Sequence, residues 1–154
     1  MQHSKYKYLK PLILLTYCFA SGNAISADSR DTNQLERGKL IYYKFCSRCH
    51  GKQLEGQPDW RKRRADGKLP APPQDGSGHT WHHPDDVLLG IIKKGIVPPY
   101  GPENYKSDMP AWENTLSDND IMAVLTYIKS RWPKEARDIQ DGINADSKKP
   151  FGRK

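Results

Sequence analysis

Cysteine is scarce in this sequence. Only Cys18, Cys46 and Cys49 occur among 154 residues, and Cys18 lies in a short apolar segment near the N-terminus. If that segment is removed during export, the remaining two cysteines stand three positions apart and no disulfide framework is available. Small exported domains usually depend on such a framework. The stability of this chain must therefore come from a buried core and from whatever group the two cysteines hold.

The chain also has no apolar run long enough to cross a bilayer, which takes about 20 residues. Residues 11–20 are apolar but too short, and the ten residues before them carry three lysines and no acidic residue. This pattern predicts a secretory signal peptide over residues 1–24, cut after Gly22-Asn23-Ala24, with Ala27 as the alternative site. Tyr17 precedes Cys18 where a lipid-anchor signal expects a small residue, so we expect neither a lipid anchor nor a transmembrane anchor.

Alternation of strands and helices is missing as well, and the apolar residues follow helical spacing. We predict an all-α fold with a single domain over residues 33–132, an N-terminal extension over 25–32 and a polar tail over 133–154. Helices are expected from Asn33 to Cys46, from Pro84 to Lys94 and from Ser117 to Trp132. A shorter helical stretch is expected at 135–139, whereas glycine and proline predict loops at 51–78 and 96–106.

Local signals define the ends and contacts of these helices. Pro84 is expected at the first helical position of its helix, with Gly95 just beyond the end. Ser117 and Asp120 form an acidic capping box. Gly38 costs about 1 kcal/mol in a helix interior relative to alanine, so it predicts close approach of another backbone, with the last helix as the natural candidate.

Cys46, Cys49 and His50 form the motif C-x-x-C-H. Each thiol can add across a vinyl group of haem, and two intervening residues let one helical turn present both sulfurs to one edge of the porphyrin. His50 follows the second anchor directly and can supply a neutral imidazole to the iron. The motif therefore predicts one covalently bound haem c.

Two other chemistries use a C-x-x-C pair. A dithiol redox centre expects the pair at the start of a helix inside a βαβ pattern, which this chain does not have. A zinc site could join the pair to His79 and His83, but the gap from Cys49 to His79 is about twice the usual ~12–15 residues. Both alternatives are weaker than haem attachment.

Residues in two proline-rich loops are candidates for completing the site. Leu69-Pro70-Ala71-Pro72-Pro73 has intact carbonyls but few amide donors, so one carbonyl, for which we favour Pro72, can accept the Nδ1 hydrogen of His50. The alternative is a stiff connector without contact to His50. Met109, which precedes Pro110, is the candidate distal ligand, because a thioether suits soft iron in a dry pocket. A lone methionine is more often core filler.

Basic residues exceed acidic residues, giving a formal net charge of +7. Without the three lysines of the signal peptide, 22 basic residues face 18 acidic ones. The excess gathers in Arg61-Lys62-Arg63-Arg64 and in a tail with Lys148, Lys149, Arg153 and Lys154. These runs are either a solvated surface or a means of steering toward an acidic redox partner or anionic membrane, and no nucleic-acid partner is expected for an exported protein.

Together these features resemble a class I monohaem c-type cytochrome of the exported bacterial type. The resemblance rests on Gly38-x-x-x-Tyr42, the C-x-x-C-H motif, a proline-rich loop, Met109-Pro110 and a capped last helix bearing Tyr127. It implies an all-α fold with crossed N- and C-terminal helices and haem-lining loops. It also implies thioether bonds at Cys46 and Cys49, axial ligation by His50 and Met109, orientation of His50 by Pro72, and packing of Tyr127 on Gly38.

The segment Gly78-His79-Thr80-Trp81-His82-His83 departs from the minimal pattern of that family. Members often use loop aromatics to bind haem propionates, which makes Trp81 or a histidine a candidate for that role. The alternative is a copper or zinc site formed by His79, His82 and His83, since imidazole binds both metals. Such a site needs three or four convergent ligands.

The resemblance implies a periplasmic electron carrier rather than an enzyme. His/Met ligation would fill both axial positions of the iron, so electrons would pass to redox partner proteins, such as a membrane oxidase or dehydrogenase, without substrate binding. The alternatives are a haem enzyme with an open iron position, a metal-handling module built on the histidines, and a haem subunit of a larger oxidoreductase. The sequence leaves the oligomeric state open.

The motif makes covalent attachment testable by mass. Protein matured with a c-type assembly system should have the mass of the mature chain plus one haem, and acidified organic solvent should not extract that haem. The double variant Cys46→Ala/Cys49→Ala is the control, because it can bind haem only noncovalently. Extraction of haem from the wild-type protein would contradict the prediction.

Overall fold

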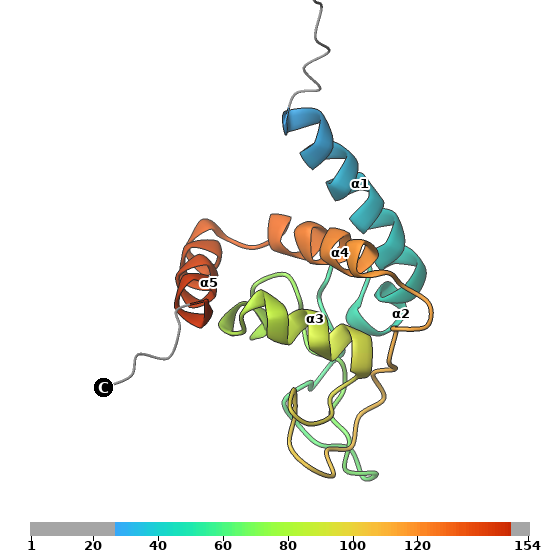
Figure 1. Cartoon of the computed structure of the whole chain (residues 1–154). Coiled ribbons are helices and arrows are strands. Elements are labelled where there is room, and N and C mark those ends of the chain that lie inside the picture. Colours follow the sequence, from blue (N-terminus) through green and yellow to red (C-terminus); the bar gives the residue numbers. More distant parts are fainter. Residues whose placement is uncertain (1–26, 149–154) are drawn as a thin grey trace, which may run out of the picture.

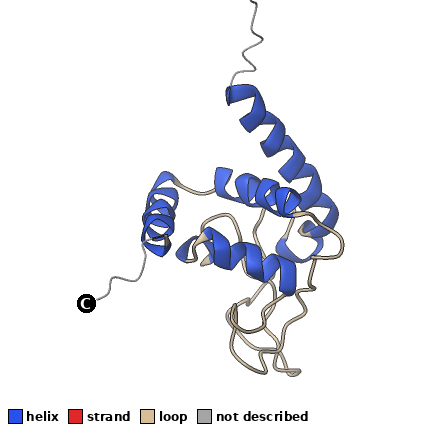
Figure 2. Cartoon of the chain, in the orientation of Figure 1, coloured by secondary structure: helices blue, strands red, loops and turns tan. Residues whose placement is uncertain are grey.

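The computed structural model describes residues 27–148, so the predicted signal peptide and the basic tail beyond Lys148 lie outside it. The described chain consists of helices joined by loops and contains no strand (Figure 2). Its elements are α1 (Ala27–Phe45), α2 (Ser47–His50), the 3₁₀ helix η1 (Thr80–His82), α3 (Asp85–Lys94), α4 (Asp118–Ser130) and α5 (Lys134–Ser147). The prediction of an all-α fold is confirmed. None of the described helices is both long and apolar enough to span a membrane.

The architecture is organised by the crossing of α1 and α4, which pack against each other (Figure 1). A Cβ atom added to Gly38 of α1 would lie 1.9 Å from the carbonyl oxygen of Ala123 in α4. Only glycine permits this approach, so the predicted contact between the two backbones is confirmed. Tyr127 packs against Tyr42 of α1, with ring centroids 5.4 Å apart, and its expected packing on Gly38 stays a prediction.

The core consists of two clusters of buried side chains that meet on α4. Four apolar residues of α4 are at most 2% exposed, namely Ile121, Val124, Leu125 and Ile128. Val124 and Ile128 pack with Tyr42 of α1, whereas Ile121 and Leu125 pack with Leu88 of α3. The predicted capping box is present at the N-terminus of α4, where Ser117 and Asp120 bond to each other's backbone N–H groups. This helix therefore joins α1 to α3.

Several helix boundaries differ from those predicted. The first helix begins at Ala27 rather than Asn33, because no glycine or proline interrupts the chain between them. Pro84 is the cap residue before α3 rather than its first helical residue. The helical stretch expected at 135–139 extends over all of α5, which packs against η1.

Helix α5 completes the N-terminus of α3. The cap residue Pro84 has no side-chain oxygen to accept a hydrogen bond from the first turn. Asn144 of α5 supplies that acceptor, since its Oδ1 lies 2.8 Å from the backbone N of Asp85. The Gln140 side chain, also of α5, is 1% exposed, and its Nε2 donates to Asp85 Oδ1 over 2.7 Å. Lys129 of α4 pairs with the same oxygen at 2.5 Å, so three helices meet at Asp85.

The contact at Gly38 predicts opposite effects for two glycine-to-alanine substitutions. Gly38→Ala should lower the free energy of unfolding by about 1–3 kcal/mol, because the added methyl group forces α1 away from α4. Gly142→Ala is the control: nothing lies within 4 Å of its added Cβ, and it should raise stability by about 0.5–1 kcal/mol through helix propensity. Denaturant unfolding of the holoproteins, followed by circular dichroism, measures both. Equal effects would contradict the proposed tight crossing.

Asp85 predicts a pH dependence of stability. Burial raises the pKa of its carboxyl, but hydrogen bonds from Lys129 and Gln140 outweigh burial and hold the pKa below the ordinary 3.8. A lowered folded-state pKa stabilises the fold above pH 3.8, and this contribution disappears as the pH falls through the folded value. Asp85→Asn should thus cost about 1–2 kcal/mol near neutral pH and progressively less below pH 3.8. Asp86→Asn, in the same helical turn, controls for the helix dipole, and a difference between the variants that does not depend on pH would contradict this assignment.

Candidate functional site

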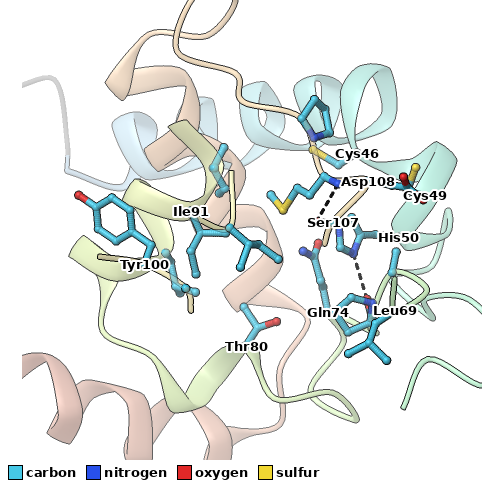
Figure 3. A pocket seen from close by; sticks show the side chains of 18 of the residues that line it. Cys46, Cys49, His50, Leu69, Gln74, Thr80, Ile91, Tyr100, Ser107 and Asp108 are labelled. Atoms are coloured by element: carbon cyan, nitrogen blue, oxygen red, sulfur yellow. Dashed lines mark hydrogen bonds between the residues drawn. The ribbon is translucent and has the colours of Figure 1, made fainter. Parts of the chain in front are cut away.

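A cavity of about 400 Å³ lies between the helices and the long loops (Figure 3). Its volume falls within the ~300–1,000 Å³ typical of small-molecule and cofactor sites. Most of its wall is apolar and comes from α1, α3, α4 and the loops, including Phe45, Leu69, Leu88, Ile91, Ile92, Ile96, Trp112, Val124, Leu125 and Ile128. Such a wall suits a large apolar ring that must be kept from water.

The C-x-x-C-H motif forms one side of this cavity. Cys46 follows the end of α1 directly, and Cys49 and His50 belong to the short helix α2. All three residues line the cavity, with Cys46 half-buried, Cys49 exposed and His50 buried. The hydroxyl group of Tyr42 donates to the carbonyl oxygen of Gly51 over 2.8 Å. This bond ties the turn that follows the motif back to α1.

The surroundings of Cys46 argue against a reactive dithiol at this position. Removal from water, together with the nearby Cys49, raises the pKa of the Cys46 thiol to about 12. Redox-active cysteines instead have lowered pKa values and are largely thiolate at neutral pH. The pair therefore suits covalent attachment better than thiol–disulfide exchange.

The hydrogen bond expected between His50 and Pro72 is present. His50 Nδ1 lies 2.9 Å from the carbonyl oxygen of Pro72, as the dashed line from His50 in Figure 3 shows. Since a carbonyl only accepts, Nδ1 carries the hydrogen and Nε2 keeps its lone pair for a metal. Burial lowers the pKa of His50, and the bond to Pro72 only partly offsets this effect. The imidazole is thus held neutral in the tautomer that an iron ligand requires.

Met109 lines the same cavity as the motif. It belongs to the long segment 96–111 between α3 and Trp112, hereafter the methionine loop. Its backbone N–H donates to Ser107 Oγ over 3.0 Å. Met122, by contrast, belongs to α4, packs against the second core cluster and does not line the cavity. Of the two methionines in the described chain, only Met109 reaches the site.

The aromatic and histidine segment divides into two groups. His79 and His83 line the cavity, with ring centroids 5.6 Å apart. Trp81 and His82 do not line it. The indole N–H of Trp81 donates to the carbonyl oxygen of Gly76 over 3.1 Å, and its ring packs against the core. Gly76 thus accepts from the indole donor of Trp81, and the role of Trp81 at a haem propionate stays a prediction.

A metal site built on the three histidines has no support in the structure. Across residues 27–148, no group of three or more His, Cys, Asp or Glu side chains is arranged to hold a metal ion. His79 instead stacks on Trp60, with centroids 5.7 Å apart and planes inclined by 13°. Partial burial is the main cause that lowers the pKa of His83, and the charge of His82 lowers it further. His79 and His83 are thus polar residues in the lining of a mostly apolar cavity.

Gln74 is a cavity residue that sequence reasoning missed. Its backbone is fixed from both sides, since its N–H donates to Leu54 O over 2.7 Å and its carbonyl oxygen accepts from the Trp132 indole over 2.8 Å. Its side-chain Oε1 is buried and has no hydrogen-bond partner within the described chain. A buried polar atom without a partner indicates an additional bound group or water. The residue belongs to no motif and to no apolar periodicity. A glutamine in a loop is also ordinarily solvated, so the sequence gives no signal for it.

The donor set fits a haem. Two thiols, a neutral imidazole and a thioether converge on one apolar cavity, which matches two covalent anchors and two axial ligands. Zinc sites in proteins do not ordinarily include a thioether, and a thiolate is their usual sulfur ligand. The chemistry of these donors therefore suits haem iron better than zinc.

Comparison with known proteins agrees with this site. A family model described as "Cytochrome C oxidase, cbb3-type, subunit III" matches residues 33–128, which is more than half of the chain. The matched segment contains every candidate anchor and ligand but not α5. Comparison with curated proteins and with solved structures finds no match.

Proposed function

Because the chain belongs to the cytochrome c oxidase, cbb3-type, subunit III family and contains a class I c-type cytochrome domain, we propose that it transfers single electrons on one covalently bound haem c with His/Met ligation. The observation that carries this proposal is the convergence of the motif and Met109 on one apolar cavity. When bound, haem supplies one-electron exchange between ferric and ferrous iron.

Each residue would have a separate role. Cys46 and Cys49 would each form a thioether, with the sulfur bonding to one vinyl carbon and the thiol hydrogen going to the other. His50, oriented by Pro72, would occupy one axial position and Met109 the other. The apolar walls contributed by α3 and α4 would exclude water, so that little reorganisation accompanies the change in iron charge.

We further propose that the protein acts in the periplasm with redox partner proteins. Its expected signal peptide and its c-type haem motif both support export. The description of the family as an oxidase subunit favours one specific partner class, a membrane oxidase, to which this chain would deliver electrons or in which it would be a haem subunit. We propose that it is a carrier rather than an enzyme, because two axial ligands leave the iron no position for substrate.

Replacement of Met109 tests the proposed ligation. Met109→Ala should abolish the weak sulfur-to-iron absorption band at the red end of the oxidised spectrum and lower the reduction potential, since water or another ligand replaces the thioether. Met122→Leu is the matched control, because it removes the other methionine of the described chain at a cost below about 1.5 kcal/mol and should keep the band.

The same spectra separate a carrier from an enzyme. Wild-type protein without the band, or one that binds small ligands as readily as Met109→Ala, would have an open iron position and would contradict the carrier role.

A further inference from the structure

The methionine loop has few backbone hydrogen bonds to hold it in place. It contains no helix or strand. Between the N–H of Tyr105 and that of Trp112, no residue of the loop donates a hydrogen bond to another backbone carbonyl. The N–H of Met109 bonds to Ser107 within the same loop, which shapes the segment but does not attach it to the rest of the protein. Side chains must therefore hold this part of the loop against the cavity.

The side chain that does so is Asp108, the neighbour of Met109. Its two carboxylate oxygens are divided between two cations, with Oδ2 paired to Arg64 and Oδ1 paired to Lys68. Both partners lie some 40 residues earlier in the chain, in residues 61–68, which we call the basic turn. Asp108 is among the residues that line the cavity (Figure 3). The pairs thus link two loops that both contribute residues to the cavity wall.

The basic turn is built to receive this carboxylate. The N–H of Arg64 bonds to Lys68 O over 2.9 Å, and the N–H of Gly67 bonds to Arg64 O over 2.9 Å. Asp66 Oδ1 accepts from the N–H of Lys68 over 2.9 Å, and Asp66 also lies 3.6 Å from the Arg64 guanidinium. These bonds within the basic turn hold Arg64 and Lys68 in place without any contribution from the methionine loop. Preorganisation of this kind lowers the entropy cost of an ion pair.

Most cations of the run are engaged within the protein. The Arg61 guanidinium lies 4.0 Å from the Trp60 ring centroid, and that of Arg63 lies 5.5 Å from the Tyr105 ring. Arg63 also donates to Gly67 O over 2.7 Å. The contact with Tyr105 is a second link from the basic turn to the methionine loop. Residues 61–64 are exposed, so this intramolecular role is additional to the solvated surface or steering patch that the sequence predicts.

We propose that the carboxylate of Asp108, through Arg64 and Lys68, holds the methionine loop closed over the cavity. Asp108 is thus a positioning residue for the thioether of Met109. The inference rests on the proposed function, since it concerns the ligand which that function assigns to the iron. Because the three charged side chains are between 33% and 51% exposed, salt should weaken the link.

Imidazole added to oxidised holoprotein is the probe, because it can bind the iron only when Met109 leaves. Its apparent affinity rises in proportion to the fraction of molecules with an open loop. Asp108→Asn should therefore bind imidazole about three- to tenfold more tightly than wild type at low salt, as expected for loss of two surface ion pairs. In about 0.5 M salt, where the Debye length falls below ~5 Å, the difference should shrink.

Two matched variants isolate the link between the loops. Glu103→Gln removes the same charge from the methionine loop at a carboxylate that forms no ion pair within residues 27–148, and it should bind imidazole as wild type does. Asp66→Asn removes the carboxylate that pairs with Arg64 inside the basic turn, so it should tighten imidazole binding, but less than Asp108→Asn does. Lys68→Gln should tighten binding on its own but have less effect in an Asp108→Asn background, because the two residues share one interaction.

The outcomes distinguish this inference from the proposed function. If wild type shows the sulfur-to-iron band and Asp108→Asn binds imidazole no more tightly than Glu103→Gln, the role of Asp108 is refuted while the ligation stands. If wild type lacks the band, both the ligation and the positioning of Met109 are refuted. Thermal unfolding of each holoprotein tests for general destabilisation. If destabilisation alone opened the loop, variants that lose equal stability would bind imidazole equally tightly.

Discussion

The contact between Gly38 and the backbone of Ala123 is the constraint on which the rest of the structure depends. It sets how closely α1 approaches α4. Cys46 follows α1 directly, and α4 lines the cavity through Val124, Leu125 and Ile128. The width of the site is therefore determined by a contact made two helical turns before the first anchor. A larger side chain at Gly38 would act on the site without touching it.

The proposed ligands are held by two different kinds of interaction. His50 belongs to a helix, is buried and is oriented by a hydrogen bond to the carbonyl oxygen of Pro72. Met109 belongs to a loop whose attachment comes from charged side chains near the surface. Buried hydrogen bonds are insensitive to ionic strength, whereas exposed ion pairs are screened. The proposed ligation by Met109 should consequently depend more strongly on ionic strength than the proposed ligation by His50 does.

Sequence reasoning succeeded where a signal is local. The C-x-x-C-H motif predicts one helical turn, Ser117 predicts a capping box, and Gly38 predicts close approach of another backbone. The structure shows each of these features. Sequence reasoning missed Gln74, a loop residue that reaches the cavity. It also did not predict that Trp81 donates to Gly76. The partner of a loop side chain is set by tertiary packing, which no spacing encodes.

The cap that Asn144 provides for α3 also has a consequence for the order of folding. A chain that emerges N-terminus first presents the motif and α1 early, and α3 about 40 residues later. The acceptor for the N–H of Asp85 emerges only with α5, near the end of the described chain. The first turn of α3, a helix that lines the cavity, can thus be capped only after α5 has been made. A chain that ended before α5 would leave this turn without its cap.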